Sequence, residues 1–113
     1  MTKSKNIECF ELSDFKGGWF IGNFEPSLLK TEKFEASIKK HPKGEEWPKH
    51  YHKIATEFNY IFEGKVEISG KTYKKGQIFV VPPEYVVEPN FLEDCIILCI
   101  KTPGPPDDKY IVD

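Results

Sequence analysis

The stretch that decides the fold runs from residue 44 to residue 64 and reads GEEWPKHYHKIATEFNYIFEG. Residues two apart on a β-strand face the same side, so His50 and His52 can present two imidazole rings to one ion. Glu57 follows five residues later, across a short turn, and can return a carboxylate to the same face. Two histidines and one carboxylate are the ligand set that holds non-haem iron or a similar divalent metal. The stretch therefore predicts a metal site on a β-strand scaffold.

The spacing of this stretch resembles the first motif of the cupin family at every fixed position. Gly44 is followed by five residues, the His50-x-His52 pair, four residues, Glu57, six residues and Gly64. Chance matches of this length and specificity are rare, so the resemblance is a strong signal. It extends over most of the chain, from about residue 34 to about residue 100.

The second cupin motif is present only in part. Gly76, followed by five residues and then Pro82, fits it. Glu84 stands where the motif has glycine, Val87 stands where it has histidine, and Asn90 falls one position short of the expected asparagine. The family's usual third histidine ligand therefore has no counterpart, because a valine side chain cannot bind an ion.

The resemblance implies an all-β fold, a double-stranded β-helix or jelly roll with a metal inside. It implies one cupin-like domain over residues 1–113, with a barrel over about 17–101 and an extended carboxy-terminal strap over 102–113. The strap ends in apolar residues that can pack on the domain or on a neighbour. Cupins generally form homodimers, and pairing open sheet edges and straps across a two-fold axis would protect both. We therefore expect a homodimer.

By the same resemblance the metal ligands would be His50, His52 and Glu57, and the metal a divalent transition ion such as iron, manganese, nickel or zinc. Two interpretations stay open. In one, three protein ligands suffice and water or substrate completes the coordination. In the other, the site is degenerate, and the three side chains hydrogen-bond one another across the strands while the pocket binds an organic metabolite without metal.

The strand pattern supports the same fold independently. Short segments rich in β-branched and aromatic residues recur between turn signals, and none keeps a helical period for three turns, which indicates a β-sandwich or barrel. A single helical turn is expected over residues 27–33. The expected strands cover residues 19–24, 34–39, 49–52, 57–62, 65–69, 71–74, 77–81, 85–88 and 94–101.

Strand alternation adds residues to the expected cavity. Asn59 shares the parity of Glu57 and is expected to line the pocket or to be a buried, hydrogen-bonded amide. Tyr85 shares the parity of Val87 and is expected either to line the pocket beside it or to serve in packing. His41 has the parity opposite to the apolar positions of its strand, which argues against a ligand role.

Composition narrows the class of ligand. All sixteen basic residues are lysines, and with eighteen acidic residues the net charge is −2, which gives no attraction to nucleic acid or to an anionic membrane. The chain lacks arginine, the usual bidentate grip on phosphate and carboxylate groups. Lysine, backbone amides or a metal would have to hold an anionic substrate. Lys40, in phase with Ile38, is expected either to reach inward or to lie on the surface.

The expected function follows from these patterns. No long apolar run or secretory signal is visible and the cysteines are odd in number, so we expect a cytoplasmic protein with free thiols. One hypothesis is a metal-dependent enzyme, of oxygenase or isomerase type, that acts on a small polar metabolite. The alternative is a non-catalytic, metabolite-binding or sensory cupin with an optional or absent metal. Whether the protein is an enzyme stays open at this stage, because a fold does not determine a reaction.

Overall fold

The computed structural model describes residues 6–112, and their regular structure is β apart from two 3₁₀ helices of three residues, η1 (Leu12–Asp14) and η2 (Lys16–Gly18). The all-β prediction is confirmed. No helix between residues 6 and 112 is long and apolar enough to cross a membrane. The strands are β1 (Trp19–Ile21), β2 (Glu35–His41), β3 (His50–Tyr51), β4 (Thr56–Glu63), β5 (Lys65–Ile68), β6 (Lys71–Lys74), β7 (Ile78–Val81), β8 (Asn90–Phe91), β9 (Cys95–Thr102) and β10 (Tyr110–Ile111).

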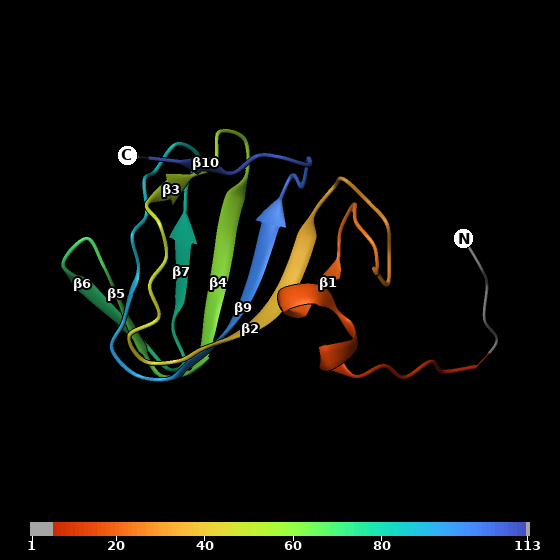
Figure 1. Ribbon diagram of the computed structural model, residues 1–113, viewed down its shortest axis with the longest axis horizontal. Helices are drawn as coiled ribbons and strands as arrows, with labels where there is room; N and C mark the ends of the chain where they lie inside the picture. Colours follow the sequence, from red (N-terminus) through yellow and green to blue (C-terminus); the bar gives the residue numbers. More distant parts are fainter. Residues whose placement is uncertain (1–5, 113) are drawn as a thin grey trace.

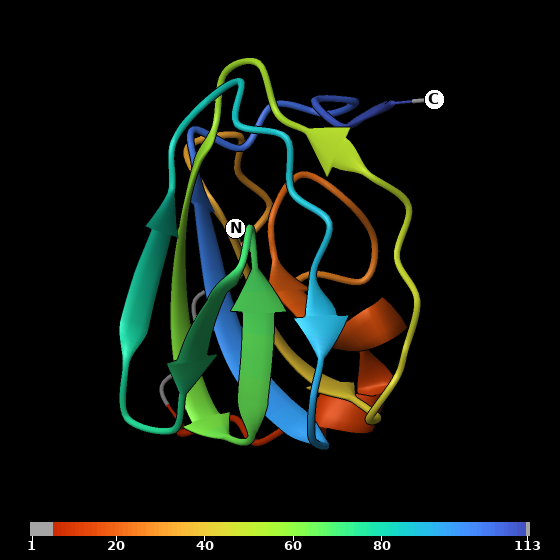
Figure 2. The same cartoon turned by 90° about the vertical axis from the view of Figure 1, so that its left-hand side faces the viewer.

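The strands form antiparallel sheets that enclose a shared interior. A five-stranded sheet has the order β1-β2-β9-β4-β7, and a three-stranded sheet has the order β6-β5-β8 (Figure 1). Figure 2 shows the three-stranded sheet standing in front of the five-stranded one. A third, two-stranded sheet pairs β10 with β3, and a backbone bridge between His50 and Val87 ties β3 to the segment before β8. Two facing antiparallel layers of this kind are the architecture of a jelly roll.

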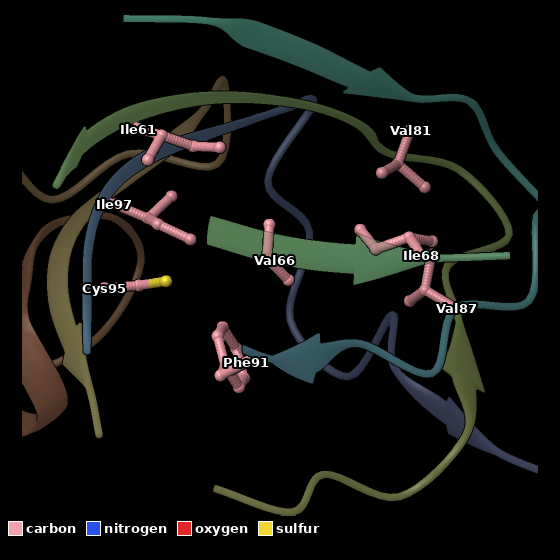
Figure 3. Packing of buried hydrophobic residues seen from close by; sticks show 8 residues of the cluster. All are labelled: Ile61, Val66, Ile68, Val81, Val87, Phe91, Cys95 and Ile97. Carbon is pink, nitrogen blue, oxygen red and sulfur yellow. The ribbon is translucent and has the colours of Figure 1, made fainter. Parts of the chain in front are cut away.

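Apolar side chains from both layers meet in this interior (Figure 3). Ile61 on β4 is fully buried, and Val66 on β5 is almost so. Removing such side chains from water is the main favourable term in folding, at about 25 cal/mol per Å² of apolar surface. The cluster consists of Ile61, Val66, Ile68, Val81, Val87, Phe91, Cys95 and Ile97.

The register across β2, β9 and β4 decides which side chains share the interior face of the larger sheet. Strand residues two apart face the same side, so the inward positions form rows that cross the three strands. From one end to the other, the rows are Glu35–Lys101–Glu57, Ser37–Cys99–Asn59 and Lys39–Ile97–Ile61. The interior therefore changes from charged, through polar, to mainly apolar along these strands.

The inward face of β2 is its polar face, although the apolar pattern of this strand predicts the opposite. Ser37, Lys39 and His41 line the interior cavity, whereas Ile38 lies on the other side, in a hollow that it shares with Leu12 and Phe15 of the amino-terminal segment. The apolar side of β2 is outside the barrel because the η1–η2 segment covers it. The expectation that His41 faces away from the cavity is therefore wrong. Of the two alternatives left open for Lys40, the structure gives the surface position, because Lys40 is exposed.

The carboxy-terminal strap folds back onto its own domain. Tyr110 pairs with Tyr51 in the sheet, and their rings stack with centroids 5.3 Å apart. The carboxylate of Asp108, which is only 8% exposed, accepts hydrogen bonds from three consecutive backbone amides, those of Lys53, Ile54 and Ala55. This clasp fixes the turn between β3 and β4. Residues 1–5 and 113 of the expected domain lie outside the described residues.

Three local predictions differ from the structure. Residues 27–33 form bends and not a helical turn, because the Ser27 hydroxyl accepts from the amides of Gly22 and Leu29 and competes with helical bonding. Residues 85–88 form no strand beyond the bridge at Val87, because two prolines and a left-handed Glu84, with φ of 68°, precede them. The two-residue strands β8 and β10 were not predicted, since so short a segment carries no periodicity.

Candidate functional site

The site is a cavity of about 390 Å³ between the two layers. Its size falls in the range of small-molecule pockets, which is about 300–1,000 Å³. Of the residues predicted from the sequence, the cavity wall includes His50, His52, Glu57, Asn59 and Val87. These side chains come from β3, from β4 and from the loop before β8, so the fold brings them to one place.

His50 in β3 and His52, which directly follows this strand, are held in the same way. Nδ1 of His50 donates a hydrogen bond to the carbonyl oxygen of Pro48 at 3.0 Å, and Nδ1 of His52 donates to the carbonyl oxygen of Asp108 at 2.8 Å. A carbonyl oxygen can only accept, so each Nδ1 carries a proton. In the neutral imidazole each Nε2 then keeps a lone pair. Backbone contacts of this type orient histidines that bind metals.

The His52 ring faces the carboxylate of the first motif. Nε2 of His52 and Oε2 of Glu57 are 2.9 Å apart, and both side chains are mostly buried. Two lone-pair atoms at this distance repel each other unless a hydrogen atom or a bound cation lies between them. The His50 ring lies beside His52, with ring centroids 5.6 Å apart.

The electrostatic environment favours the metal-binding protonation states of His50 and Glu57. Burial is the largest influence on His50 and lowers the pKa of its imidazole below 6.5, although the bond to Pro48 opposes this. Burial by itself would raise the pKa of Glu57. The hydrogen bond and charge of His52, together with the charge of Lys101, outweigh burial and hold the pKa of the Glu57 carboxyl below 4.5. A neutral imidazole and an ionised carboxylate are the forms that bind cations.

The polar row next to Glu57 contains unused hydrogen-bonding groups. Ser37 Oγ and Asn59 Nδ2 are buried and have no hydrogen-bond partner within 3.5 Å among residues 6–112, although the Asn59 amide helps to lower the pKa of Glu57. Cys99 lies between them in the register, and burial raises the pKa of its thiol well above the ordinary value. Cys99 is therefore a thiol at neutral pH, not a nucleophilic thiolate.

Lysines from three elements also line the cavity: Lys39 on β2, Lys101 on β9 and Lys109 in the strap. The sequence analysis missed them, although Lys101 shares strand parity with the buried Ile97 and this signal could have revealed it. Lys101 pairs with Glu35, with a distance of 3.1 Å between Nζ and Oε1. Lys40 is exposed, which is the surface alternative of the sequence analysis.

Tyr85 is outside the cavity. Its side chain is largely exposed, and its hydroxyl is 2.6 Å from the Ser69 hydroxyl in a hydrogen bond. Strand parity misplaced Tyr85 because the chain is in a turn there.

His41 lines the cavity but contacts groups other than His50, His52 and Glu57. Its Nδ1 forms a hydrogen bond with Glu45 at 2.9 Å, and its ring stacks on Phe91.

Val87, which stands where the second cupin motif would have histidine, lines the cavity. The backbone amides and carbonyls of Val87 and His50 exchange both hydrogen bonds, at 2.8 and 3.1 Å, so the two residues are direct antiparallel neighbours. Within residues 6–112, no three histidine, cysteine, aspartate or glutamate side chains are arranged as a complete metal-binding set. The donor chemistry of His50, His52 and Glu57 nevertheless fits a divalent metal, because the Nε2 lone pairs and the carboxylate are uncommitted apart from their contact with each other.

Comparison with known proteins assigns the fold. The sequence matches no protein family and no curated protein. A protein from Klebsiella pneumoniae with a double-stranded β-helix domain has a similar structure, with a TM-score of 0.69, 17% identity, and coverage of 99% of this chain and 97% of the other. An RmlC-like cupin from Shewanella frigidimarina is 25% identical, with a TM-score of 0.58 and coverage of 67% and 71%.

The DMSP lyase DddQ from Ruegeria pomeroyi is also similar, with a TM-score of 0.62, 16% identity, and coverage of 79% of this chain and 48% of that enzyme. The fold is the double-stranded β-helix of the cupins, and on this basis the chain is assigned to the cupin superfamily. The cupin resemblance in the sequence is confirmed at this level.

Proposed function

We propose that the protein is a metal-dependent enzyme, of oxygenase or isomerase type, that acts on a small polar metabolite. His50, His52 and Glu57 would hold one divalent transition metal such as iron, manganese, nickel or zinc. The observation that carries the proposal is the pairing of both Nδ1 protons with backbone carbonyls, which leaves two Nε2 lone pairs and a buried carboxylate for one cation.

When bound, the metal would supply Lewis-acid chemistry, stabilising negative charge on an oxygen atom of the metabolite. The protein's own contributions are positioning and proton handling. A hydrogen atom between His52 Nε2 and Glu57 Oε2, which lie 2.9 Å apart, would have to leave when a cation takes its place. Ser37 and Asn59 offer buried groups to a polar ligand, and the apolar side chains of the cavity wall exclude water.

The alternative is a non-catalytic cupin that binds or senses a metabolite. The observation in its favour is Val87, which presents an apolar surface directly beside His50. A protein that binds a metabolite tightly and leaves it unchanged after prolonged incubation with metal would favour this alternative.

The decisive test of the metal site is elemental analysis after metal repletion. We expect about one metal ion per chain in the wild type, and loss of that ion in the His50→Ala, His52→Ala double variant. His41→Gln is the matched control, because it removes the third histidine of the chain from outside the proposed ligand set. Substoichiometric metal that the double variant does not reduce further would overturn the proposal.

We further propose a cytoplasmic homodimer. Several large apolar side chains on the outer face of the five-stranded sheet are exposed, and burying them against a second copy would remove them from water. They include Phe58, Phe62, Ile78, Val80 and Ile100. Sedimentation should then give twice the chain mass of 13.1 kDa. A monomer at micromolar concentration would contradict the dimer and leave the metal proposal intact.

A further inference from the structure

We propose that the ligand of this cavity is a small organic carboxylate, held by the ammonium groups of Lys39, Lys101 and Lys109. This inference rests on the proposed function in using the same cavity, and it adds the chemical class of the ligand. It does not depend on the metal, so the two proposals can fail separately.

The first observation is the convergence of three ammonium groups at two indole rings. Nζ of Lys39 lies 4.9 Å from the ring centroid of Trp19 and 5.0 Å from that of Trp47. Nζ of Lys101 lies 4.7 Å from the Trp19 centroid, and Nζ of Lys109 lies 4.7 Å from the Trp47 centroid. Both rings line the cavity. Lysines distant in sequence are therefore gathered around one wall, where the indole faces stabilise their charge.

The second observation is that these cations are not neutralised by the protein. Glu35 pairs with Lys101, but Lys39 and Lys109 have no carboxylate within 4.0 Å among the described residues. The cavity wall includes four lysines and three glutamates, a balance of +1 when its histidines are neutral. Burial lowers the pKa of Lys39, and the like charges of Lys109 and Lys101 lower it further. An anion in the cavity would remove this repulsion.

The third observation is a pair of buried donors without acceptors. Ser37 is 0% exposed and Asn59 is 5% exposed, and neither Ser37 Oγ nor Asn59 Nδ2 has a hydrogen-bond partner within 3.5 Å between residues 6 and 112. The Asn59 amide does act on the carboxylate of Glu57, because it helps to lower the pKa of that carboxyl. A buried donor without a partner costs about 1–3 kcal/mol, so such groups are rare unless a ligand or water satisfies them. Both groups belong to the row between Glu57 and Ile61, beside the proposed metal ligands. A ligand rich in oxygen atoms would satisfy them.

The charge balance favours a carboxylate over a phosphate. One excess positive charge matches a monoanion, whereas a phosphate monoester carries about two negative charges at neutral pH. The chain has no arginine, the residue that proteins favour for bidentate phosphate recognition. The ligand must also be small, because the cavity volume is about 390 Å³. These properties together point to a compact, hydroxylated monocarboxylic acid.

The test compares acids with neutral alcohols of the same carbon skeleton. The probes are lactate against propane-1,2-diol, and gluconate against glucitol, titrated into metal-free and metal-loaded protein and followed by amide chemical shifts. We expect at least one acid to bind at least tenfold more tightly than its alcohol, with shifts at cavity residues. We also expect the binding to weaken as potassium chloride is added, because the interaction is ionic.

Two matched pairs of variants identify the groups responsible. Lys39→Met removes the inward ammonium and keeps an unbranched apolar stem, whereas Lys40→Met makes the same change on the exposed neighbour. Lys109→Met repeats the removal at an exposed strap position, where a change of side chain is expected to affect folding little, and Lys53→Met is its exposed counterpart. We expect Lys39→Met and Lys109→Met to weaken acid binding at least tenfold, and the two control variants to leave it unchanged.

The outcomes separate this inference from the metal proposal. Acid binding to metal-free protein that depends on Lys39 supports the inference even if no metal binds. The inference is overturned if the alcohols bind as tightly as the acids, if neither member of any pair binds, or if the inward variants behave like their controls. If metal binds at full occupancy in that case, the metal proposal still stands.

Discussion

The two ends of one interior face differ in chemistry although the same three strands build them. At one end, β2, β9 and β4 present Glu35, Lys101 and Glu57, with His52 against the last of these. Four residues further along β4, the inward positions are Ile61 and, across the ladder, Ile97. The strand alternation is the same at both ends, so the difference lies only in which side chains occupy the inward positions.

This difference separates stability from function within the barrel. The apolar end contributes Ile61 and Ile97 to the core cluster. The charged end keeps buried polar groups that are costly in a stable core unless they are paired. We therefore expect changes at the apolar end to lower stability and changes at the charged end to alter binding. Changes in the carboxy-terminal strap are expected to affect both stability and binding.

Truncation at the apolar end should have the largest effect on stability. Ile61 is completely buried, so Ile61→Ala should lower the free energy of unfolding by about 2–5 kcal/mol, through lost burial and a new cavity. Ile7→Ala, at a position 99% exposed in the amino-terminal segment, should change it by less than about 0.5 kcal/mol. Urea titrations followed by circular dichroism measure both. Equal losses in the two variants would mean that the apolar end is not the core.

Breaking the contacts of Asp108 with the turn between β3 and β4 should have the next largest effect on stability. Asp108→Asn removes the charge that three backbone amides share, and hydrogen bonds to charged groups contribute about 1.5–3 kcal/mol. We expect a loss of about 2 kcal/mol in unfolding free energy, measured by urea titration. Because the Asp108 carbonyl also orients His52, metal affinity should fall as well. Asp107→Asn, at the exposed neighbouring residue, is the control. An equal loss of unfolding free energy in this variant would contradict the role of the Asp108 carboxylate.

Adding a third histidine at the charged end should have a smaller effect, and this effect should be a gain in metal affinity rather than a loss. Val87 is the direct neighbour of His50 and faces the cavity, so Val87→His should add a ligand beside the other imidazoles. We expect metal binding about tenfold tighter, which corresponds to about 1.4 kcal/mol. Competition with a chelator measures the affinity, and Val86→His, at an exposed position, is the control. Unchanged affinity in Val87→His would mean that the second motif is misaligned at this position.

The smallest expected effect is on the pH dependence of stability. Burial depresses the pKa of His50 in the folded protein, so the unfolded chain takes up this proton first as the pH falls below 6.5. Stability present at neutral pH is then lost progressively on acidification. Glu57, whose pKa is also depressed, acts in the same direction only below about pH 4.5.

Urea titrations of metal-free protein between pH 7 and pH 5 isolate the contribution of His50. His50→Gln should show a smaller decline in unfolding free energy over this interval than the wild type. A decline of the same size in both proteins would show that the histidine does not titrate as its burial requires.

The sequence by itself determined the fold class and the first-motif residues. Alternation and turn residues are local, so they identified β4, β5 and β6 closely, and the spacing of His50, His52 and Glu57 placed these residues on one face. Asn59 followed from the same parity. Such inferences succeed because a strand fixes the relative orientation of residues a few positions apart.

Only the tertiary structure decided which side of β2 faces the cavity. An apolar strand face shows that something covers it, but not whether the cover is the barrel core or another segment. Here the η1–η2 segment packs beside Ile38, so the polar face with Ser37 and Lys39 turns inward. The same limit applies to the strap, because the contact between Asp108 and His52 joins residues 56 positions apart. Local sequence patterns do not encode such contacts, since they depend on how the whole chain is packed.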